Sequence, residues 1–488
     1  MTGSMSESTL SASPRRLRPR RTKIIATIGP ASDAPEIIEE MIRVGMNVAR
    51  FNLSHGSFPE HAERIRRVRA AAARAGAFTA ILVDTKGSEI RTGRLRGGKA
   101  SLAAGDHFEL YFQPRTGDAS GVSVSNVKLG DALGAGDSVL LDDGTIELRV
   151  ESVGRESVRC AIIRGGLLRD SKGVNLPDSR LQFAAEDRLT REELAFAVEQ
   201  DVDYIAASFV HDEKDIDAIR GILEELGAKI PIIAKVENRA AVTNLDSIVN
   251  AANGTMVARG DLGVEFPLAE VPAIQKIVIR TTVTNGKPVI TATQMLDSME
   301  RNSRPTRAEV SDVANAILDG SSAVMLSGET AMGKYPVESV RTMSALAVRA
   351  EASLKEFGQL QKILPNPSNV ITEAVSQAAI AMADHLKAAA IISLTETGFT
   401  SRLISKYRPN CPIVAVTTSV EVVRRFSMNW GVHALHYTGK ASDQDKVQFA
   451  IRRAKELGWV QVGDIVVATS GQALQAGSTN LIRVVVVE

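Results

Sequence analysis

The chain has 488 residues, which at roughly 150 residues per domain suggests about three domains. Its 58 Lys and Arg residues and 57 Asp and Glu residues leave a net charge of +1, which argues against nucleic acid as the main partner. A hydrophobic content of 44% argues against a mostly disordered chain, and no apolar run approaches the roughly 20 residues that span a membrane. The two cysteines, Cys160 and Cys411, fit a reducing, cytoplasmic location.

The N-terminal segment differs in composition from the rest of the chain. Residues 1–21 are rich in Ser and Arg and contain one acidic residue, Glu7. Such a segment is typical of a disordered tail and also of an organelle transit peptide, and its start, MTGSM, resembles a remnant of cloning. We predict a disordered tail over residues 1–21 and leave the other two interpretations open.

From Thr22 onward, short apolar runs alternate with amphipathic segments, which is the pattern of βα units. Strands are predicted at Lys23–Ile28, Asn47–Phe51, Thr79–Val83, Asp203–Ala207, Pro231–Val236, Thr255–Ala258, Pro288–Thr291 and Ala323–Leu326. The helices predicted between them include Pro35–Val44, Glu60–Ala75, Glu213–Leu226 and Arg307–Leu318. Eight such units close into a (β/α)8 TIM barrel with its active site at the carboxyl ends of the strands. We assign this catalytic domain to residues 22–87 and 185–353.

Two further domains are predicted on either side of the second barrel segment. Residues 88–184 contain short alternating strands and turns rich in Gly and Asp, which predict a small inserted β-barrel. An insert at the catalytic rim suits a lid, although a purely structural insert is the alternative. In residues 354–488, the alternation of apolar runs and helical segments predicts an open C-terminal α/β domain. Its predicted strands are Ala389–Leu394, Pro412–Val416, Asp464–Ala468 and Ile482–Val487.

The segment PIIAKVEN places Lys235 and Glu237 two residues apart at the end of a strand, on the same side. Asp261, in ARGDLG, follows the next strand and should lie beside Glu237. Neighbouring carboxylates repel each other without a cation, and Mg²⁺ takes one or two carboxylates with water and substrate oxygens. We predict a Mg²⁺ (or Mn²⁺) site there, with a plain salt bridge to Lys235 as the alternative. Gly260 would allow an anionic ligand to approach the backbone closely.

Further polar side chains follow other predicted strands of the barrel. Arg50 lies in NVARFNLSHG and is suited to contact phosphate. Four oxygen donors near it could hold a monovalent cation, although each is also an ordinary cap or turn residue: Asn52, Ser54, Asp84 and Thr85. Thr293, Ser327 and Glu329 close the last two strands, where they could relay protons or simply cap helices.

In the C-terminal domain, the hydroxyl-rich turn TETGFT leads from a predicted strand into a helix. Such a turn is either a phosphate cradle or an ordinary capped βα turn. The candidate effector-binding residues are Thr395, Thr397, Gly398 and Thr400. A second loop, residues 471–480, could face this turn.

These motifs in this order resemble the pyruvate kinase family. The resemblance rests on TKIIATIGPAS, MNVARFNLSHG, DTKGSEIRTG, GVNLP, AKVEN, MVARGDLGVE, TATQML and MLSGETAMGKYP. It implies a phosphotransferase that converts phosphoenolpyruvate and ADP into pyruvate and ATP, the last step of glycolysis. It further implies dependence on Mg²⁺ and K⁺.

The resemblance also implies roles for individual residues. Arg50 and Lys235 would bind the phosphoryl group, with Lys235 stabilising the transition state. Glu237 and Asp261 would hold Mg²⁺, and Gly260, Asp261 and Thr293 would position the substrate. The residues that would bind K⁺ are Asn52, Ser54, Asp84 and Thr85. The residues that would contact the nucleotide are Asn52, His55, Arg91 and Lys172. Protonation of the enolate would be organised by Thr293, Ser327 and Glu329. Glu89 is the usual companion of K⁺ dependence in the family.

Regulation is where the chain departs from the family pattern. Glu396 stands at a position that is often basic or small in members activated by a sugar bisphosphate. We therefore expect another phosphorylated metabolite, a sugar monophosphate or a nucleotide, as effector, and by analogy a homotetramer. The alternatives are a Mg²⁺-dependent lyase or aldolase acting on 2-oxo acids, and a non-catalytic metabolite sensor.

Overall fold

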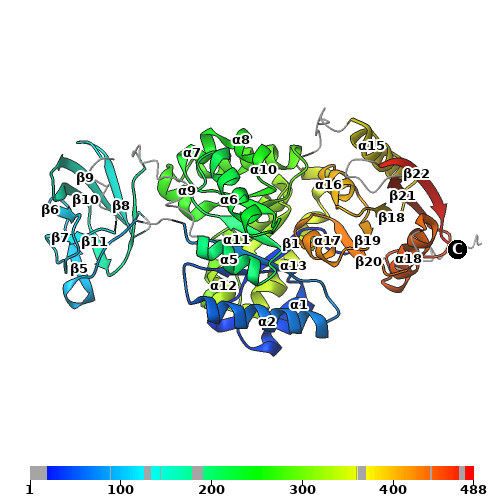
Figure 1. The fold of residues 1–488 in the computed structure, drawn as a ribbon, viewed down its shortest axis with the longest axis horizontal. Coiled ribbons are helices and arrows are strands. Elements are labelled where there is room, and N and C mark those ends of the chain that lie inside the picture. The colour runs from blue at the N-terminus through cyan, green and yellow to red at the C-terminus, as the bar shows by residue number, and fades with distance from the viewer. Residues whose placement is uncertain are drawn as a thin grey trace, which may run out of the picture. The chain divides into compact units, whose positions relative to one another are not determined.

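A computed structural model describes residues 19–87, 90–125, 133–142, 144–177, 191–358, 360, 370–439, 442–471 and 479–488. The predictions for residues 1–18, for Glu89 and for most of the 471–480 loop lie outside these residues. The chain divides into two compact units (Figure 1). The larger comprises Thr22–Leu364 and Ser427–Trp430, and the smaller comprises Pro365–Phe426, Gly431–Glu488 and the described residues before Thr22.

Eight parallel strands of the larger unit form a closed barrel, each paired with the next in chain order and the last with the first. They are β1 (Lys23–Thr27), β2 (Val48–Asn52), β3 (Ala80–Asp84), β13 (Tyr204–Ala207), β14 (Ile232–Val236), β15 (Gly254–Ala258), β16 (Val289–Ala292) and β17 (Ala323–Leu326). Strands buried on both faces read as continuous apolar runs, which is why the sequence pattern located them. The predicted fold class is confirmed.

The helices of this unit follow the strands around the barrel (Figure 1). They are α1 (Pro35–Val44), α2 (Phe58–Arg74), α5 (Arg191–Glu199), α6 (Glu213–Glu225), α7 (Arg239–Thr243), α8 (Leu245–Ala251), α9 (Arg259–Glu265), α10 (Val271–Thr284), α11 (Arg307–Asp319), α12 (Gly328–Ala331), α13 (Pro336–Glu351) and α14 (Leu354–Phe357). A capping box fixes the start of α11, since Thr306 accepts from the Glu309 N–H and Glu309 accepts from the Thr306 N–H. The short 3₁₀ turn η3 (Asp297–Glu300) lies between β16 and α11.

Between β3 and α5, the described residues form an insert of short strands with one 3₁₀ turn at Arg96–Gly98. Its strands are β4 (Ile90–Arg91), β5 (Lys99–Leu102), β6 (His107–Tyr111), β7 (Gly121–Ser123), β8 (Ser138–Leu141), β9 (Ile146–Val153), β10 (Ser157–Arg164), β11 (Gly166–Arg169) and β12 (Gly173–Asn175). They form a seven-stranded sheet in the order β4-β12-β8-β9-β10-β6-β7 and a two-stranded pair of β5 and β11. Phe108, Leu110 and Cys160 belong to an apolar core of its own.

The smaller unit contains a five-stranded sheet in the order β20-β19-β18-β21-β22, in which only β22 runs antiparallel. Its strands are β18 (Ala390–Leu394), β19 (Ile413–Thr417), β20 (Val432–His436), β21 (Ile465–Gly471) and β22 (Thr479–Val486). Its helices are α15 (Val370–His385), α16 (Phe399–Lys406), α17 (Val420–Arg425) and α18 (Asp443–Glu456). Residues of α18 belong to one apolar cluster of this sheet and residues of α15 and α16 to another, so helices cover both faces.

The sequence analysis missed β20. Its sequence, VHALH, contains two histidines, and Val432 is its one buried residue. The strand therefore lacks the apolar run that identified its neighbours, and its pairing with β19 holds it in the sheet.

Candidate active site

Lys235 projects from the end of β14 into a cluster of polar side chains. Its Nζ lies 3.0 Å from Glu237 Oε2 and 3.4 Å from Asp84 Oδ1. It also donates a hydrogen bond of 2.8 Å to Ser208 Oγ. Burial by itself would lower the pKa of Lys235, but the carboxylates of Asp84, Glu237 and Asp261 outweigh that effect and raise the pKa. The lysine is therefore held as a cation.

The carboxyl group of Glu237 is buried beside this lysine. Its Oε1 accepts a hydrogen bond from the Phe209 N–H, and its buried Oε2 pairs with Lys235 Nζ at 3.0 Å and has no other partner among the described residues. The salt bridge to Lys235 that the sequence offered as the alternative is therefore present. Burial raises the pKa of Glu237, the charge of Lys235 lowers it, and the nearby Asp261 raises it further, so the pKa lies above its usual range. Asp261 therefore lies close enough to Glu237 for the two negative charges to repel each other, as the sequence predicted.

This pair of carboxylates has the chemistry of a Mg²⁺ site. A buried carboxylate that has one lysine as its charged partner and a second carboxylate nearby is stabilised further by a bound cation. Within the described ranges, no three His, Cys, Asp or Glu side chains are grouped to hold a metal by themselves. Mg²⁺ usually completes its coordination with water and substrate oxygens, so two carboxylates suffice as its protein ligands.

Arg50, in the middle of β2, is fixed by side chains of the neighbouring strands β1 and β3. Its Nε and Nη2 each lie 2.8 Å from Asp84 Oδ2, and its Nη1 donates a hydrogen bond of 2.9 Å to Thr27 Oγ1. Burial alone would raise the pKa of Asp84, but the charges of Lys235 and Arg50 outweigh it and the pKa is lowered. Asp84 therefore stays ionised between two cations.

The four residues predicted to bind a monovalent cation come from the adjacent ends of β2 and β3. Asn52 and Asp84 are register partners on these strands. Asn52 Oδ1 accepts a hydrogen bond of 3.1 Å from the Ser54 N–H, and Thr85 Oγ1 donates one of 3.2 Å to Ala206 O. The structure brings these residues together. Asn52 also makes the local turn contact that the alternative interpretation expected, whereas the Thr85 hydroxyl contacts the neighbouring strand β13.

Gly260 and Thr293, from the ends of β15 and β16, contact each other directly. Thr293 Oγ1 accepts a hydrogen bond of 2.8 Å from the Gly260 N–H and donates one of 2.7 Å to Ala292 O. Thr293 has a positive φ of 66°. Its hydroxyl is thus anchored in an unusual turn beside the Gly260 backbone.

Glu329 and Ser327 differ in their surroundings although they are two residues apart. The buried carboxylate of Glu329 accepts hydrogen bonds from the Leu296 N–H at 3.0 Å and the Ser327 N–H at 2.7 Å. Burial raises the pKa of Glu329 in spite of these bonds. Ser327 Oγ is buried and has no hydrogen-bond partner among the described residues. Of these two residues, Ser327 is therefore the one whose side chain can still form a hydrogen bond to a ligand.

The residues predicted to contact nucleotide fall in two places. His55 lies in the exposed loop between β2 and α2. Arg91 and Lys172 lie together in the all-β insert, where Arg91 Nη1 donates to Ser171 O at 3.0 Å and Lys172 Nζ pairs with Asp142 Oδ1 at 2.7 Å. Arg91 in β4 and Lys172 directly before β12 therefore lie side by side, since β4 and β12 are paired.

In the smaller unit, the TETGFT turn has the contacts of a capped βα turn. Thr395 Oγ1 accepts a hydrogen bond of 3.0 Å from the Gly398 N–H, and the Thr400 hydroxyl is bonded to that of Thr479. Thr397 is exposed. Both buried threonine hydroxyls of this turn are thus engaged within the protein.

Glu396, in the same turn, carries its own set of partners. Its carboxylate lies 2.8 Å from Lys446 Nζ and accepts hydrogen bonds from the hydroxyl and the N–H of Thr418 at 2.6 and 3.1 Å. Burial alone would raise the pKa of Glu396, but these partners outweigh it and lower the pKa. Glu396 is thus an ionised group anchored beside the predicted cradle.

Sequence reasoning missed two residues that organise the rim, Ser208 and Arg259. Ser208 follows β13 as a single hydroxyl outside any motif, so only its position after a barrel strand could have pointed to it. Arg259 lies within ARGDLG, where the interpretation rested on the neighbouring Gly260 and Asp261.

Comparison with known proteins identifies the family. The profile described as "Pyruvate kinase, barrel domain" matches residues 19–340, and "Pyruvate kinase, alpha/beta domain" matches residues 373–485. The pyruvate kinase of Sporosarcina psychrophila is 45% identical over 472 residues, which are 96% of this chain and 80% of that protein. The pyruvate kinase of Clostridium acetobutylicum is 42% identical over 472 residues, 96% of this chain and all of that protein.

A solved structure agrees in fold. The crystal structure of a pyruvate kinase from Cryptosporidium parvum matches with a TM-score of 0.89 and 37% identity, covering 96% of both chains. Together the two profiles cover the barrel and the C-terminal sheet, and these relatives and this structure each cover 96% of the chain. The chain is an enzyme of the phosphotransferase class and belongs to the pyruvate kinase family.

Proposed function

We propose that the chain transfers the phosphoryl group of phosphoenolpyruvate to ADP, with the chemistry performed at the carboxyl ends of β2, β3 and β14–β17. The observation that carries the proposal is the partly buried ammonium group of Lys235, held by Asp84, Ser208 and Glu237. Phosphoryl transfer needs positioning and charge stabilisation rather than covalent catalysis, and a fixed cation supplies both.

Lys235 and Arg50 are the two cations of this site. Arg50 is preorganised by Asp84 and Thr27, so its guanidinium loses little freedom when it binds a phosphoryl oxygen. The raised pKa of Lys235 keeps its charge available when negative charge develops on the transferred group. We assign phosphoryl binding to both and transition-state stabilisation to Lys235.

Glu237 and Asp261 are the proposed ligands of Mg²⁺, supported by the burial of the Glu237 carboxylate and the repulsion between the two carboxylates. When bound, Mg²⁺ would neutralise charge on substrate oxygens. Asn52, Ser54, Asp84 and Thr85 are the proposed K⁺ ligands. Their neutral oxygens and single carboxylate suit a monovalent ion.

The substrate would lie against Gly260, Asp261 and Thr293. Ser327 is the best supported candidate for orienting the proton donor to the enolate, since its buried hydroxyl has no partner among the described residues. We assign Glu329 a supporting role, because its carboxylate accepts the backbone N–H groups of Ser327 and Leu296.

The remaining assignments concern the rest of the molecule. Asn52, His55, Arg91 and Lys172 are the proposed nucleotide contacts, with residues 88–184 acting as a lid. Residues 354–488 are the proposed regulatory domain, binding a phosphorylated metabolite at Thr395, Thr397, Gly398 and Thr400. We also propose a homotetramer and a cytoplasmic location, the latter supported by two free cysteines. The described part of the chain has no helix capable of crossing a membrane.

A coupled assay with lactate dehydrogenase tests the proposal. Phosphoenolpyruvate, ADP and Mg²⁺ are supplied first in K⁺ buffer and then in Na⁺ buffer, and pyruvate formation is followed. We expect rapid turnover in K⁺ and much slower turnover in Na⁺. No pyruvate in either buffer would refute the activity, whereas equal rates would refute only the K⁺ site. The lyase and sensor alternatives gain no support from the comparisons.

A further inference from the structure

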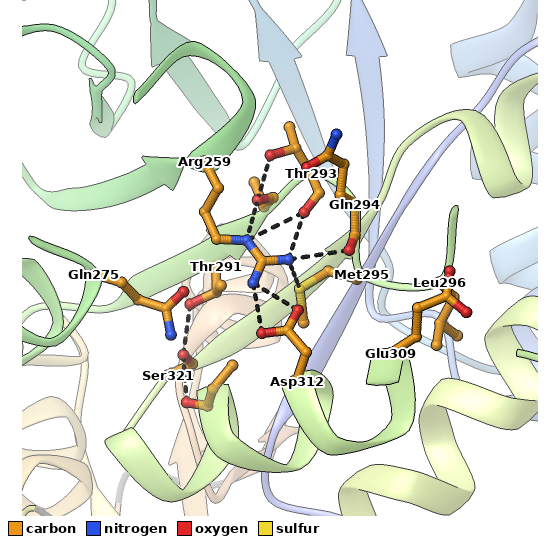
Figure 2. Close-up of polar contacts among 12 residues, drawn as sticks. Arg259, Gln275, Thr291, Thr293, Gln294, Met295, Leu296, Glu309, Asp312 and Ser321 are labelled. Atoms are coloured by element: carbon orange, nitrogen blue, oxygen red, sulfur yellow. Dashed lines mark hydrogen bonds and ion pairs between the residues drawn. The ribbon is translucent and has the colours of Figure 1, made fainter. Parts of the chain in front are cut away.

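The guanidinium group of Arg259 links three neighbouring elements at the rim of the barrel. Arg259 is the first residue of α9, directly after β15. Its Nη1 lies 2.8 and 2.6 Å from the two carboxylate oxygens of Asp312 on α11 (Figure 2). Asp312 thereby fixes the position of the guanidinium and balances its charge.

The same guanidinium binds the backbone of the turn that follows β16. Its Nε donates hydrogen bonds of 3.2 Å to the carbonyl oxygens of Ala292 and Thr293. Its Nη2 donates at 2.6 Å to the Thr293 oxygen and at 3.3 Å to that of Gln294 (Figure 2). Three consecutive carbonyl groups are therefore directed toward one cation.

This turn has an unfavourable backbone conformation. Thr293 and Gln294 have φ values of 66° and 52°, in the left-handed region that residues with a β-carbon rarely occupy, and Thr293 is also β-branched. Two such residues in succession persist only when the surrounding structure holds them. The charged hydrogen bonds from Arg259 are interactions of that kind.

The turn determines where the Thr293 hydroxyl lies. Thr293 Oγ1 accepts the Gly260 N–H at 2.8 Å, and Gly260 is the residue next to Arg259. Arg259 therefore restrains both partners of this hydrogen bond. Gly260 is its neighbour in the sequence, and the Thr293 carbonyl oxygen accepts hydrogen bonds from its guanidinium. A lysine could not reproduce this arrangement, because a single ammonium group cannot pair with both carboxylate oxygens and also span three carbonyls.

We infer that Arg259, fixed by Asp312, is a positioning residue that holds the Thr293–Gln294 turn in its left-handed conformation and so builds the substrate-binding side of the site. The inference rests on the proposed substrate contacts of Gly260 and Thr293. Arg259 itself touches no substrate in this scheme, and it acts through the turn.

The test is a double-mutant cycle on kcat/KM for phosphoenolpyruvate, using Arg259→Lys, Asp312→Asn and Thr293→Ala singly and in pairs. Misplacing the turn should lower kcat/KM by about ten- to a hundredfold in Arg259→Lys, with a smaller loss in Asp312→Asn. Because the effect passes through Thr293, adding Thr293→Ala to Arg259→Lys should cost at most about threefold more. KM for ADP should change by less than about twofold.

The matched control is Arg66→Lys, which alters a bidentate arginine–glutamate pair on the exposed face of α2 and should leave kcat/KM unchanged. Fully additive losses in the cycle, or an Arg259→Lys enzyme with unchanged kcat/KM, would overturn the inference. If Arg259→Lys does not fold, as judged by circular dichroism, the cycle of Asp312→Asn with Thr293→Ala decides in the same way. Absence of turnover in the unaltered protein would refute the proposed function instead.

Discussion

The ammonium group of Lys235 lies among Asp84, Ser208 and Glu237, and the distribution of charge there decides its protonation state. Removing a charged amine from water favours its neutral form, whereas three carboxylates nearby favour the cation and prevail. Asp84 is balanced in turn by Lys235 and Arg50. The cluster is thus a network in which each charge is compensated by its neighbours.

Replacing Lys235 with Met should lower kcat by several orders of magnitude, since the lysine charge acts mainly on the transition state. KM for phosphoenolpyruvate should change much less. The measurement is the coupled assay, with circular dichroism to verify folding. Lys214→Met, on the exposed surface of α6, is the control. A Lys235→Met enzyme with a rate near that of the unaltered protein would remove the lysine from its proposed role.

At the scale of single elements, a hydrogen bond from His61 connects α2 to the loop that precedes it. His61 Nε2 lies 2.7 Å from His55 O, and its buried Nδ1 has no hydrogen-bond partner among the described residues. Burial lowers the pKa of His61, the bond to His55 and the charge of Glu60 raise it, and Arg64 lowers it. The neutral ring therefore holds the loop that carries His55, one of the proposed nucleotide contacts.

This lowered pKa predicts a pH dependence of stability. Above the ordinary histidine pKa of 6.5, folded and unfolded chains both hold His61 neutral. As the pH falls through that value the unfolded chain takes up the proton first, so the folded state loses stability. His61→Gln removes this proton uptake and keeps a hydrogen-bond donor.

The difference in unfolding midpoint between the unaltered protein and His61→Gln, measured in urea from pH 8 to pH 5, should therefore shift in favour of the variant at low pH. A difference that stays constant over this range would contradict the assignment of a neutral, buried His61.

The elements themselves were predictable to different degrees. The eight barrel strands each begin and end within one residue of their predicted limits, because burial on both faces imposes a continuous apolar run. By contrast, β20 has a single buried residue, and its strand conformation comes from pairing with β19. Local sequence therefore predicts an element well where burial dictates its residues.

At the scale of the whole molecule, ion binding should be linked to folding. A ligand that binds only the folded state stabilises it by an amount that grows with its concentration, about 2.7 kcal/mol at a hundred times its dissociation constant. Millimolar Mg²⁺ without substrates should raise the first thermal transition by a few degrees, and EDTA should reverse the shift. Glu237→Gln should lose most of this stabilisation.

Glu225→Gln, at an exposed ion pair on α6, is the control and should keep the full stabilisation by Mg²⁺. The measurement is differential scanning calorimetry, which is independent of turnover. An equal effect of Mg²⁺ on the transition temperatures of Glu237→Gln and the unaltered protein would exclude Glu237 as a ligand.

The sequence by itself determined the order of βα units, the all-β insert, the family motifs and the residue types at the ends of the strands. These features are local, since periodicity and motif spacing are read within a few tens of residues. Only the tertiary structure decided that the Ser208 hydroxyl accepts a hydrogen bond from Lys235 and that Arg259 joins Asp312 to the turn after β16. Such contacts connect residues 27 and 53 positions apart, and they exist because closure of the barrel brings the ends of different strands to one rim.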